Sequence, residues 1–182
     1  MGKNISTPQN GVPSENAMKT LTAFLLTFAL SVCAVCAEIK VYFSPDGGCT
    51  KAIVEQIAKA KKSIRVQAYS FTSAPIAAAI VDAHRRKVAV QVILDKSQRT
   101  DKYSSATFFK NNGVPTLIDA AHKIAHNKVI LIDGETVITG SFNFSKAAEE
   151  DNAENVLVIR DAKIAKQYVE NWSEHKQHSD VH

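Results

Sequence analysis

The chain has 182 residues, of which 45% are hydrophobic, and a formal net charge of +4 at pH 7. This length and apolar content fit one globular domain with a substantial core. The modest charge excludes a large surface that wraps nucleic acid, but it is compatible with a local basic groove.

The first 37 residues are expected to lie outside that domain. Residues 1–17 are polar and rich in Asn, Pro, Ser and Gly, without apolar periodicity, which is typical of disorder. We interpret them as an upstream over-extension of a chain that starts at Met18. Residues 18–37 contain a lysine, an apolar stretch from Leu21 and small residues ending at Ala37, which are the features of a secretory signal peptide.

We therefore expect cleavage after Ala37, which leaves a periplasmic or secreted domain over residues 38–182 with no stable membrane association. A retained membrane anchor is the alternative, although residues 21–37 are short for a spanning helix. A lipoprotein site at Cys33 or Cys36 is disfavoured because valine precedes each cysteine. Cleavage would remove both and leave Cys49, which forms no intrachain disulfide alone and is expected to be a small, partly buried residue. A cross-chain disulfide is its alternative role.

Segments with strand and helix periodicity alternate from residue 39 onward. Strands are expected where apolar residues alternate or run continuously, at 39–43, 63–71, 88–95, 114–119, 128–133, 135–143 and 154–160. Helices are expected at 50–62, 73–87, 100–113 and 161–176, with a helical turn at 145–151. Ser73 and Asp161 mark helix starts, and Gly113 marks a helix end. The succession predicts one α/β domain, a mixed β-sheet flanked by helices on both faces.

Polar residues surround one predicted hairpin. Its strands, 128–133 and 135–143, meet at Asp133-Gly134, which is a strong hairpin signal. Residues two apart on a strand share a face, so His126 and Lys128 form one pair, and Ser141 and Asn143 form another.

Together these side chains supply an imidazole, a positive charge, a hydroxyl and an amide, a set that suits a phosphate cradle beside a nucleophile or proton carrier. Gly140 would let a ligand or backbone approach closely. Asp133 is expected to brace the site by hydrogen bonding or ion pairing. Taken singly, each residue also fits a charged strand edge or an ordinary turn.

The pattern His126-x-Lys128-x4-Asp133, followed by Gly140-Ser141-x-Asn143, resembles the HKD motif of the phospholipase D superfamily. A short exported chain with a single motif is similar to small bacterial endonucleases of that family. The resemblance covers essentially residues 38–182, including VYFSPDGGC near the start and AYSFTSAPIAAAI in the middle. It implies a phospholipase D-like fold.

The resemblance also implies a mechanism. The motif histidine would attack phosphorus, a second histidine would protonate the leaving alkoxide, and water would resolve the phosphohistidine. Lys128 and Asn143 would hold the nonbridging oxygens, with Ser141 as a further donor. Glu154 would hydrogen-bond the imidazole and set its tautomer.

Two-histidine catalysis from a chain with one motif requires two chains, so we expect a twofold homodimer with a shared site. No cofactor and no metal are expected, because Lys128 supplies the charge that a metal would, and activity should survive EDTA. No carboxylate cluster indicates Mg²⁺ or Ca²⁺ binding.

The remaining histidines and one basic run are expected to have structural rather than catalytic roles. His122 lies four residues before His126, but the glutamate of a zinc-protease motif is missing, so we interpret it as a pocket-rim or surface residue, with a functional role as the alternative. Three further histidines, expected to be solvent-exposed with adventitious metal binding as the alternative, are His175, His178 and His182. The run at 84–87 is interpreted as a charged helix end, and contact with phosphates flanking the scissile bond is its alternative.

The expected function is a metal-independent, sequence-nonspecific endonuclease that acts on DNA, with RNA as a further substrate. A phospholipase D-type lipid hydrolase is the first alternative, although no long apolar loop is evident near the motif. A catalytically silent nucleic-acid-binding module is the second, and the joint presence of His126, Lys128 and Asn143 speaks against it.

Overall fold

The computed structural model describes residues 1–2, 37–100 and 104–182. A compact unit runs from Ala37 to His182 and holds every helix and strand named below. The expected disorder of residues 1–17 and the signal peptide at 18–37 lie outside the described residues, apart from Met1, Gly2 and Ala37. Across the described ranges, no helix combines the length and apolar character needed to cross a bilayer.

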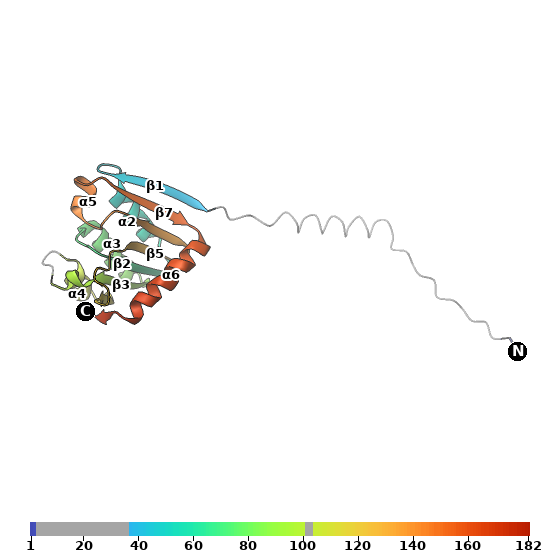
Figure 1. Ribbon diagram of the computed structural model, residues 1–182. Helices are drawn as coiled ribbons and strands as arrows, with labels where there is room; N and C mark the ends of the chain where they lie inside the picture. The colour runs from blue at the N-terminus through green and yellow to red at the C-terminus, as the bar shows by residue number, and fades with distance from the viewer. Residues whose placement is uncertain (3–36, 101–103) are drawn as a thin grey trace. The chain divides into compact units, whose positions relative to one another are not determined.

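One mixed sheet forms the centre of the unit (Figure 1). Its eight strands are, in spatial order, β1 (Glu38–Ser44), β7 (Glu154–Arg160), β6 (Thr136–Gly140), β5 (Lys128–Ile132), β2 (Ser63–Ala68), β3 (Ala89–Asp95), β4 (Thr116–Asp119) and β8 (Asp180–Val181). The strands β2, β3 and β4 are parallel to one another, and the other neighbouring pairs are antiparallel. The predicted mixed α/β sheet is confirmed.

Helices cover both faces of this sheet, as expected. On one face, α2 (Cys49–Lys59) and α3 (Ala74–Arg85) build the larger apolar cluster, and on the other face α6 (Ala162–Gln177) builds the smaller one. The indole of Trp172 in α6 donates a hydrogen bond to the Val66 carbonyl oxygen at 3.0 Å, which fixes the helix to the sheet. The shorter helices are η1 (Lys96–Arg99), α4 (Ala106–Asn111) and α5 (Lys146–Glu150).

The continuous apolar run of β5 follows from this two-sided cover. All five of its residues are buried. Ile130 and Ile132 belong to the larger cluster, whereas Val129 and Leu131 belong to the smaller one. A strand that is covered on both faces needs apolar residues at successive positions rather than at alternate ones.

Most predicted elements form, with differences at their ends. Asp161 caps α6 by accepting hydrogen bonds from the Lys163 and Ile164 amides, but Ser73 at the start of α3 makes no side-chain capping bond. The helix expected at 100–113 begins only at Ala106, and β8 was not predicted. Cys49 is fully buried, in line with its expected packing role.

The strand ends nearest the motif meet on one side of the sheet. Ala68, the last residue of β2, pairs with Lys128, the first residue of β5, and Gly140, the last of β6, pairs with Val156 near the start of β7. We call this side, where the parallel strands end, the carboxyl end of the sheet.

The basic run at 84–87 spans the last turn and the end of α3, at the opposite end of the sheet, where β3 begins. Arg86 donates hydrogen bonds to the carbonyl oxygens of Ile57 and Ala58 in the last turn of α2, at 3.2 Å each. These contacts support the interpretation as a charged helix end rather than as a phosphate contact beside the motif.

Candidate active site

His126 and Lys128 contact each other at the carboxyl end of the sheet. The Nζ atom of Lys128 lies 3.0 Å from Nδ1 of His126 and donates to the His126 carbonyl oxygen at 2.8 Å. Lys128 is only 7% exposed, whereas His126 is exposed. Burial lowers the pKa of the Lys128 ammonium below its ordinary value, and the charge of Glu154 opposes that shift. The buried ammonium of Lys128 thus lies beside the exposed imidazole of His126.

Buried polar contacts hold the segment that leads into His126. Asp95, at the end of β3, accepts a hydrogen bond from the Ala125 amide at 2.7 Å, and the Tyr69 amide donates to the Asn127 carbonyl at 2.8 Å. The Tyr69 ring lies 4.6 Å from the imidazole of His126, centroid to centroid. Sequence reasoning missed Tyr69 as a site residue, although it is part of the AYSF stretch that ends β2.

Ser141, Asn143 and Glu154 lie after β6 and at the start of β7. Ser141 Oγ donates to Glu154 Oε2 at 2.5 Å, and the second carboxylate oxygen accepts from the Asn152 side chain at 3.1 Å. The expected hydrogen bond between Glu154 and the His126 imidazole does not occur within the described residues. Glu154 instead holds the chain that follows β6, because its acceptors are directed at Ser141 and Asn152.

Asn143 is available to a further group. Its Oδ1 atom is buried and has no hydrogen-bond partner among the described residues. A buried polar atom without a partner is costly, and such atoms are frequent where a ligand or water completes a site.

Gly140 pairs with Val156 of β7 and allows these two strands to approach closely. Its φ is 151°, and a Cβ atom placed there would lie 2.1 Å from the Asn155 carbonyl oxygen. The expected close approach is therefore made by the backbone of β7, and any side chain at this position would force β6 and β7 apart.

Asp133 is not part of this site. It lies at the far end of β5, five residues from Lys128, which is a strand distance of roughly 17 Å. Its carboxylate accepts hydrogen bonds from the amides of Lys61, Lys62 and Ser63 at 2.9, 2.7 and 2.9 Å. The structure thus places Asp133 apart from His126 and Lys128, and its bracing acts on the start of β2.

A second polar cluster occupies the carboxyl end of β4. His122, His175 and His178 all contact the buried carboxylate of Asp119. The expectation that His175 is solvent-exposed was wrong, since its side chain is 13% exposed, and His178 contributes to the same cluster at 36%. No local pattern indicates this grouping, because Asp119 and His175 are 56 residues apart.

Several known proteins are similar to this chain. Residues 53–176 match the family model described as "Cardiolipin synthase, PLD-like domain". The chain is 43% identical over 145 residues to a phospholipase D of Rickettsia typhi, covering 80% of this chain and 71% of the relative.

Two solved structures share the fold over nearly their whole length. Nuc from Salmonella typhimurium, a phospholipase D family member, superposes with a TM-score of 0.77 at 38% identity, covering 81% of this chain and 99% of Nuc. NucT from Helicobacter pylori superposes with a TM-score of 0.76 at 23% identity, covering 81% and 100% of the two chains, which is a likeness of fold.

Proposed function

Because the chain belongs to the phospholipase D superfamily, we propose that it hydrolyses phosphodiester bonds through a phosphohistidine formed on His126. The observation that carries the proposal is the exposed imidazole of His126, whose Nδ1 lies 3.0 Å from the buried ammonium of Lys128. An accessible ring nitrogen beside a fixed positive charge suits attack on an anionic phosphodiester.

The proposed reaction has two displacements at phosphorus. A ring nitrogen of His126 attacks, the bond to the leaving oxygen breaks, and a second imidazole donates a proton to that oxygen. Water then loses a proton to the second imidazole and attacks phosphorus. The phosphorus–nitrogen bond breaks, which frees His126 and leaves a phosphomonoester.

Two side chains are the donors for the nonbridging oxygens, namely Lys128 and Asn143. Ser141 acts less directly, since its hydroxyl hydrogen is directed to Glu154. Since Lys128 provides positive charge at phosphorus, the proposed chemistry needs no metal ion.

Protonation states support a two-chain mechanism. The acid that protonates the leaving oxygen is a charged imidazolium, whose ring nitrogens both carry hydrogen. A nucleophilic ring needs an unprotonated nitrogen toward phosphorus, so the two roles require two rings in different surroundings. With one motif per chain, the second ring must come from another copy.

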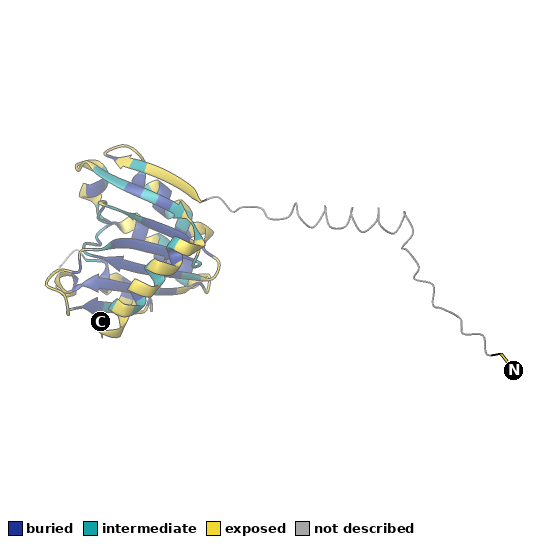
Figure 2. Cartoon of the chain, turned by 45° about the vertical axis from the view of Figure 1, so that its right-hand side comes forward, coloured by how far each residue is buried: buried dark blue, intermediate teal, exposed yellow. Residues whose placement is uncertain are grey.

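We infer a homodimer that uses the exposed face of the outermost strand. Three residues of β1 alternate along one face, Ile39, Val41 and Phe43, and they are 54%, 48% and 64% exposed. Figure 2 shows β1 exposed over most of its length beside buried inner strands. Contiguous apolar surface on an edge strand favours contact with another chain. Phe43 pairs with Asn155, the neighbour of Glu154, so a copy bound there would lie beside the site.

A nucleic-acid backbone is the substrate that we favour. Basic residues occupy the segments after β3 and β4 at the same end of the sheet as His126, namely Lys96, Arg99 and Lys123. Such charges suit an extended polyanion and confer no base preference, so affinity should fall steeply with salt. A phospholipid is the second candidate, favoured by the name of the Rickettsia typhi relative and by Ile124, which is 53% exposed two residues before His126.

The decisive experiment incubates the purified full chain with plasmid DNA, RNA or phosphatidylcholine vesicles, each in the presence of EDTA. His126→Asn is the test variant, and His84→Asn, at the opposite end of the sheet, is the matched control. Cleavage of DNA or RNA that is lost in His126→Asn and kept in His84→Asn supports the nuclease. Hydrolysis of the vesicles alone supports the lipid enzyme, and no turnover on any substrate overturns both.

A further inference from the structure

We propose that Asp119, His122, His175 and His178 bind one transition-metal ion, for which Zn²⁺ is the best match, and that this ion ties the end of α6 to the carboxyl end of the sheet. One ligand atom from each of the four residues lies within 4.8 Å of the others. The proposal rests on no part of the proposed chemistry at His126.

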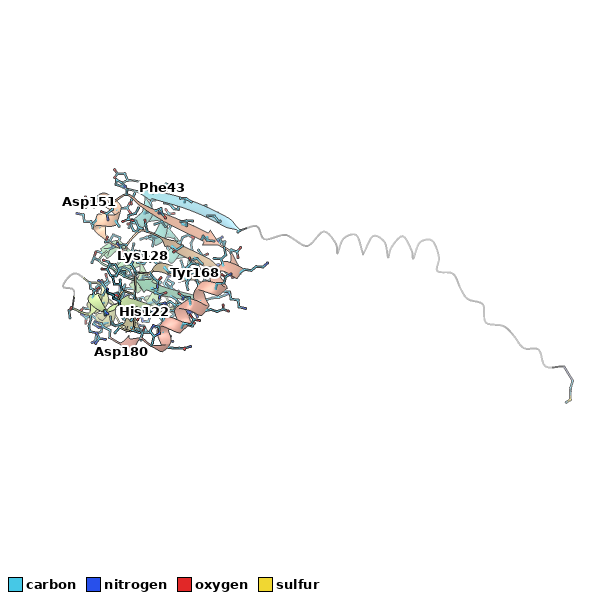
Figure 3. The ribbon with its side chains drawn as sticks, viewed as in Figure 1. Phe43, His122, Lys128, Asp151, Tyr168 and Asp180 are labelled. Atoms are coloured by element: carbon cyan, nitrogen blue, oxygen red, sulfur yellow. The ribbon has the colours of Figure 1, made fainter. Side chains whose placement is uncertain are left out.

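The four side chains converge from three parts of the fold. Asp119 is the last residue of β4, His122 follows it in the next loop, His175 lies in the last turn of α6, and His178 comes just after that helix. The Oδ2 atom of Asp119 lies 3.0 Å from Nδ1 of His122, 2.7 Å from Nδ1 of His175 and 3.3 Å from Nε2 of His178. Figure 3 shows His122 below Lys128, toward the end of the chain.

The carboxylate is held as a metal ligand would be. Asp119 is fully buried, and its other oxygen, Oδ1, accepts hydrogen bonds from the amides of Ala121 and His122 at 3.1 and 3.4 Å. These bonds fix the direction in which Oδ2 points. Neighbouring groups that orient the ligating side chains are a regular feature of metal sites in proteins.

Hydrogen bonding alone explains three histidines around one oxygen poorly. A carboxylate offers about four lone-pair sites, yet three imidazole nitrogens and two amides contact that of Asp119, with Nδ1 of His122 near both oxygens at 3.2 and 3.0 Å. The three ring centroids lie 4.7 to 5.3 Å from one another, so protonating every ring would place three positive charges against one negative charge. A divalent cation removes both conflicts, because neutral rings can direct lone pairs at it.

The ligand set selects the class of metal. Three imidazole nitrogens and one carboxylate oxygen suit tetrahedral Zn²⁺, with metal–ligand bonds of about 2.0–2.2 Å. Such bonds place neighbouring ligand atoms roughly 3.3–3.5 Å apart. The four ligand atoms already lie within 4.8 Å of one another. Mg²⁺ and Ca²⁺ prefer sets made of oxygen atoms, so they fit poorly.

The first test measures binding to the full chain, prepared without a histidine tag, stripped with EDTA and then dialysed. Isothermal titration with ZnCl₂ should give one ion per chain, and Co²⁺ in its place should give the visible absorption of tetrahedral coordination. His178→Ala should weaken Zn²⁺ binding by at least about 10-fold. His182→Ala, which alters a histidine of the same segment outside the cluster, should leave binding unchanged.

The second test separates this site from the catalytic one. EDTA should lower the melting temperature of the wild-type chain by several degrees and leave that of His178→Ala unchanged, because an ion that binds only the folded state stabilises it. Circular dichroism checks that each variant folds, and His122→Ala, with a 47% exposed side chain, is the second variant. No saturable Zn²⁺ binding, or equally tight binding in both folded variants, overturns the proposal. Absence of phosphodiesterase activity would instead count against the proposed function.

Discussion

At the scale of single residues, Lys128 combines burial with charge. It begins a strand whose residues are all buried, and its ammonium makes two hydrogen bonds to the same residue, His126. Keeping an ammonium buried is costly, because burial penalises the charged form. The buried ammonium of Lys128 therefore serves the proposed chemistry rather than stability.

We therefore expect Lys128→Met to separate activity from stability. Phosphodiester cleavage should fall by about 100- to 1,000-fold, because a donor for the nonbridging oxygens is lost. The free energy of unfolding should change by less than about 1 kcal/mol, since relief from burying a charge offsets the lost hydrogen bonds. Cleavage rates and urea unfolding measure the two effects. Lys163→Met, at an exposed position in the first turn of α6, is the control, and a Lys128→Met protein with wild-type rates would exclude Lys128 from catalysis.

At the scale of elements, Asp133 joins the β5–β6 turn to the start of β2. Burial raises its pKa, but hydrogen bonds from the Ser63, Lys61 and Lys62 amides outweigh burial and hold the pKa below its ordinary value. A carboxylate whose pKa is lowered by folding stabilises the fold above its unfolded pKa of about 3.9. That stability is lost as the pH falls through the lower folded pKa.

Asp133→Asn should accordingly reduce the free energy of unfolding by about 1–3 kcal/mol at pH 7, because three amides lose a charged acceptor. The difference in the free energy of unfolding between this variant and the wild type should become smaller as the pH drops below about 4. Urea unfolding between pH 7 and pH 3 measures this difference, and Asp151→Asn, at an exposed carboxylate, is the control. The rate per folded molecule should stay unchanged, and a large fall in that rate would return Asp133 to the site.

The close pairing of β6 with β7 depends on Gly140. Gly140→Ala should lower the free energy of unfolding by at least about 3 kcal/mol, because the new Cβ atom collides with the Asn155 backbone. Gly134→Ala isolates the effect of backbone conformation, since Gly134 also has a positive φ of 72° but has no atom within 4 Å of the added Cβ. Gly134→Ala should lower the free energy of unfolding by about 1–2 kcal/mol. Equal losses in the two variants, measured by urea unfolding, would contradict the role of the close approach.

The sequence predicted the elements better than the contacts between them. The Asp133-Gly134 turn, the apolar β5 and the Asp161 cap depend on neighbouring residues, so local patterns were sufficient. Asp133 was misplaced because its partners, Lys61 to Ser63, are about 70 residues away and offer only backbone amides. Amides are present at every position except proline and leave no trace in a sequence. The contact of Tyr69 with His126 was not predicted either, because the two residues are far apart in the sequence.

At the scale of the whole molecule, the exposed stripe on β1 and the single motif both point to a second copy. Phe43→Glu should convert dimers to monomers, because it places a charge in an apolar contact, and the monomer should lose most of its activity. Phe108→Glu is the matched control, since Phe108 is also exposed, at 44%, and lies in α4. Analytical ultracentrifugation measures the assembly, and a Phe43→Glu protein that stays dimeric would place the interface elsewhere.

Mixed dimers test whether the two rings cooperate. Wild-type and His126→Ala chains with different affinity tags can be coexpressed, and heterodimers can be isolated by two successive purifications. They should lack normal turnover, because each reaction needs one ring to attack and another to protonate. Heterodimers with half or more of the wild-type rate would show that one chain is sufficient.

The outermost strand also reaches Glu154 through hydrogen-bonded neighbours. Ser44, the last residue of β1, pairs with Glu154 and donates to the Asn152 carbonyl oxygen, and the Asn152 amide group in turn holds Glu154. Within the sheet, β1 has β7 as its single neighbour. Transient local unfolding of β1 would therefore loosen Glu154 before it disturbed the inner strands of the sheet. The rate of the proposed reaction should for this reason depend on how firmly this peripheral strand is anchored.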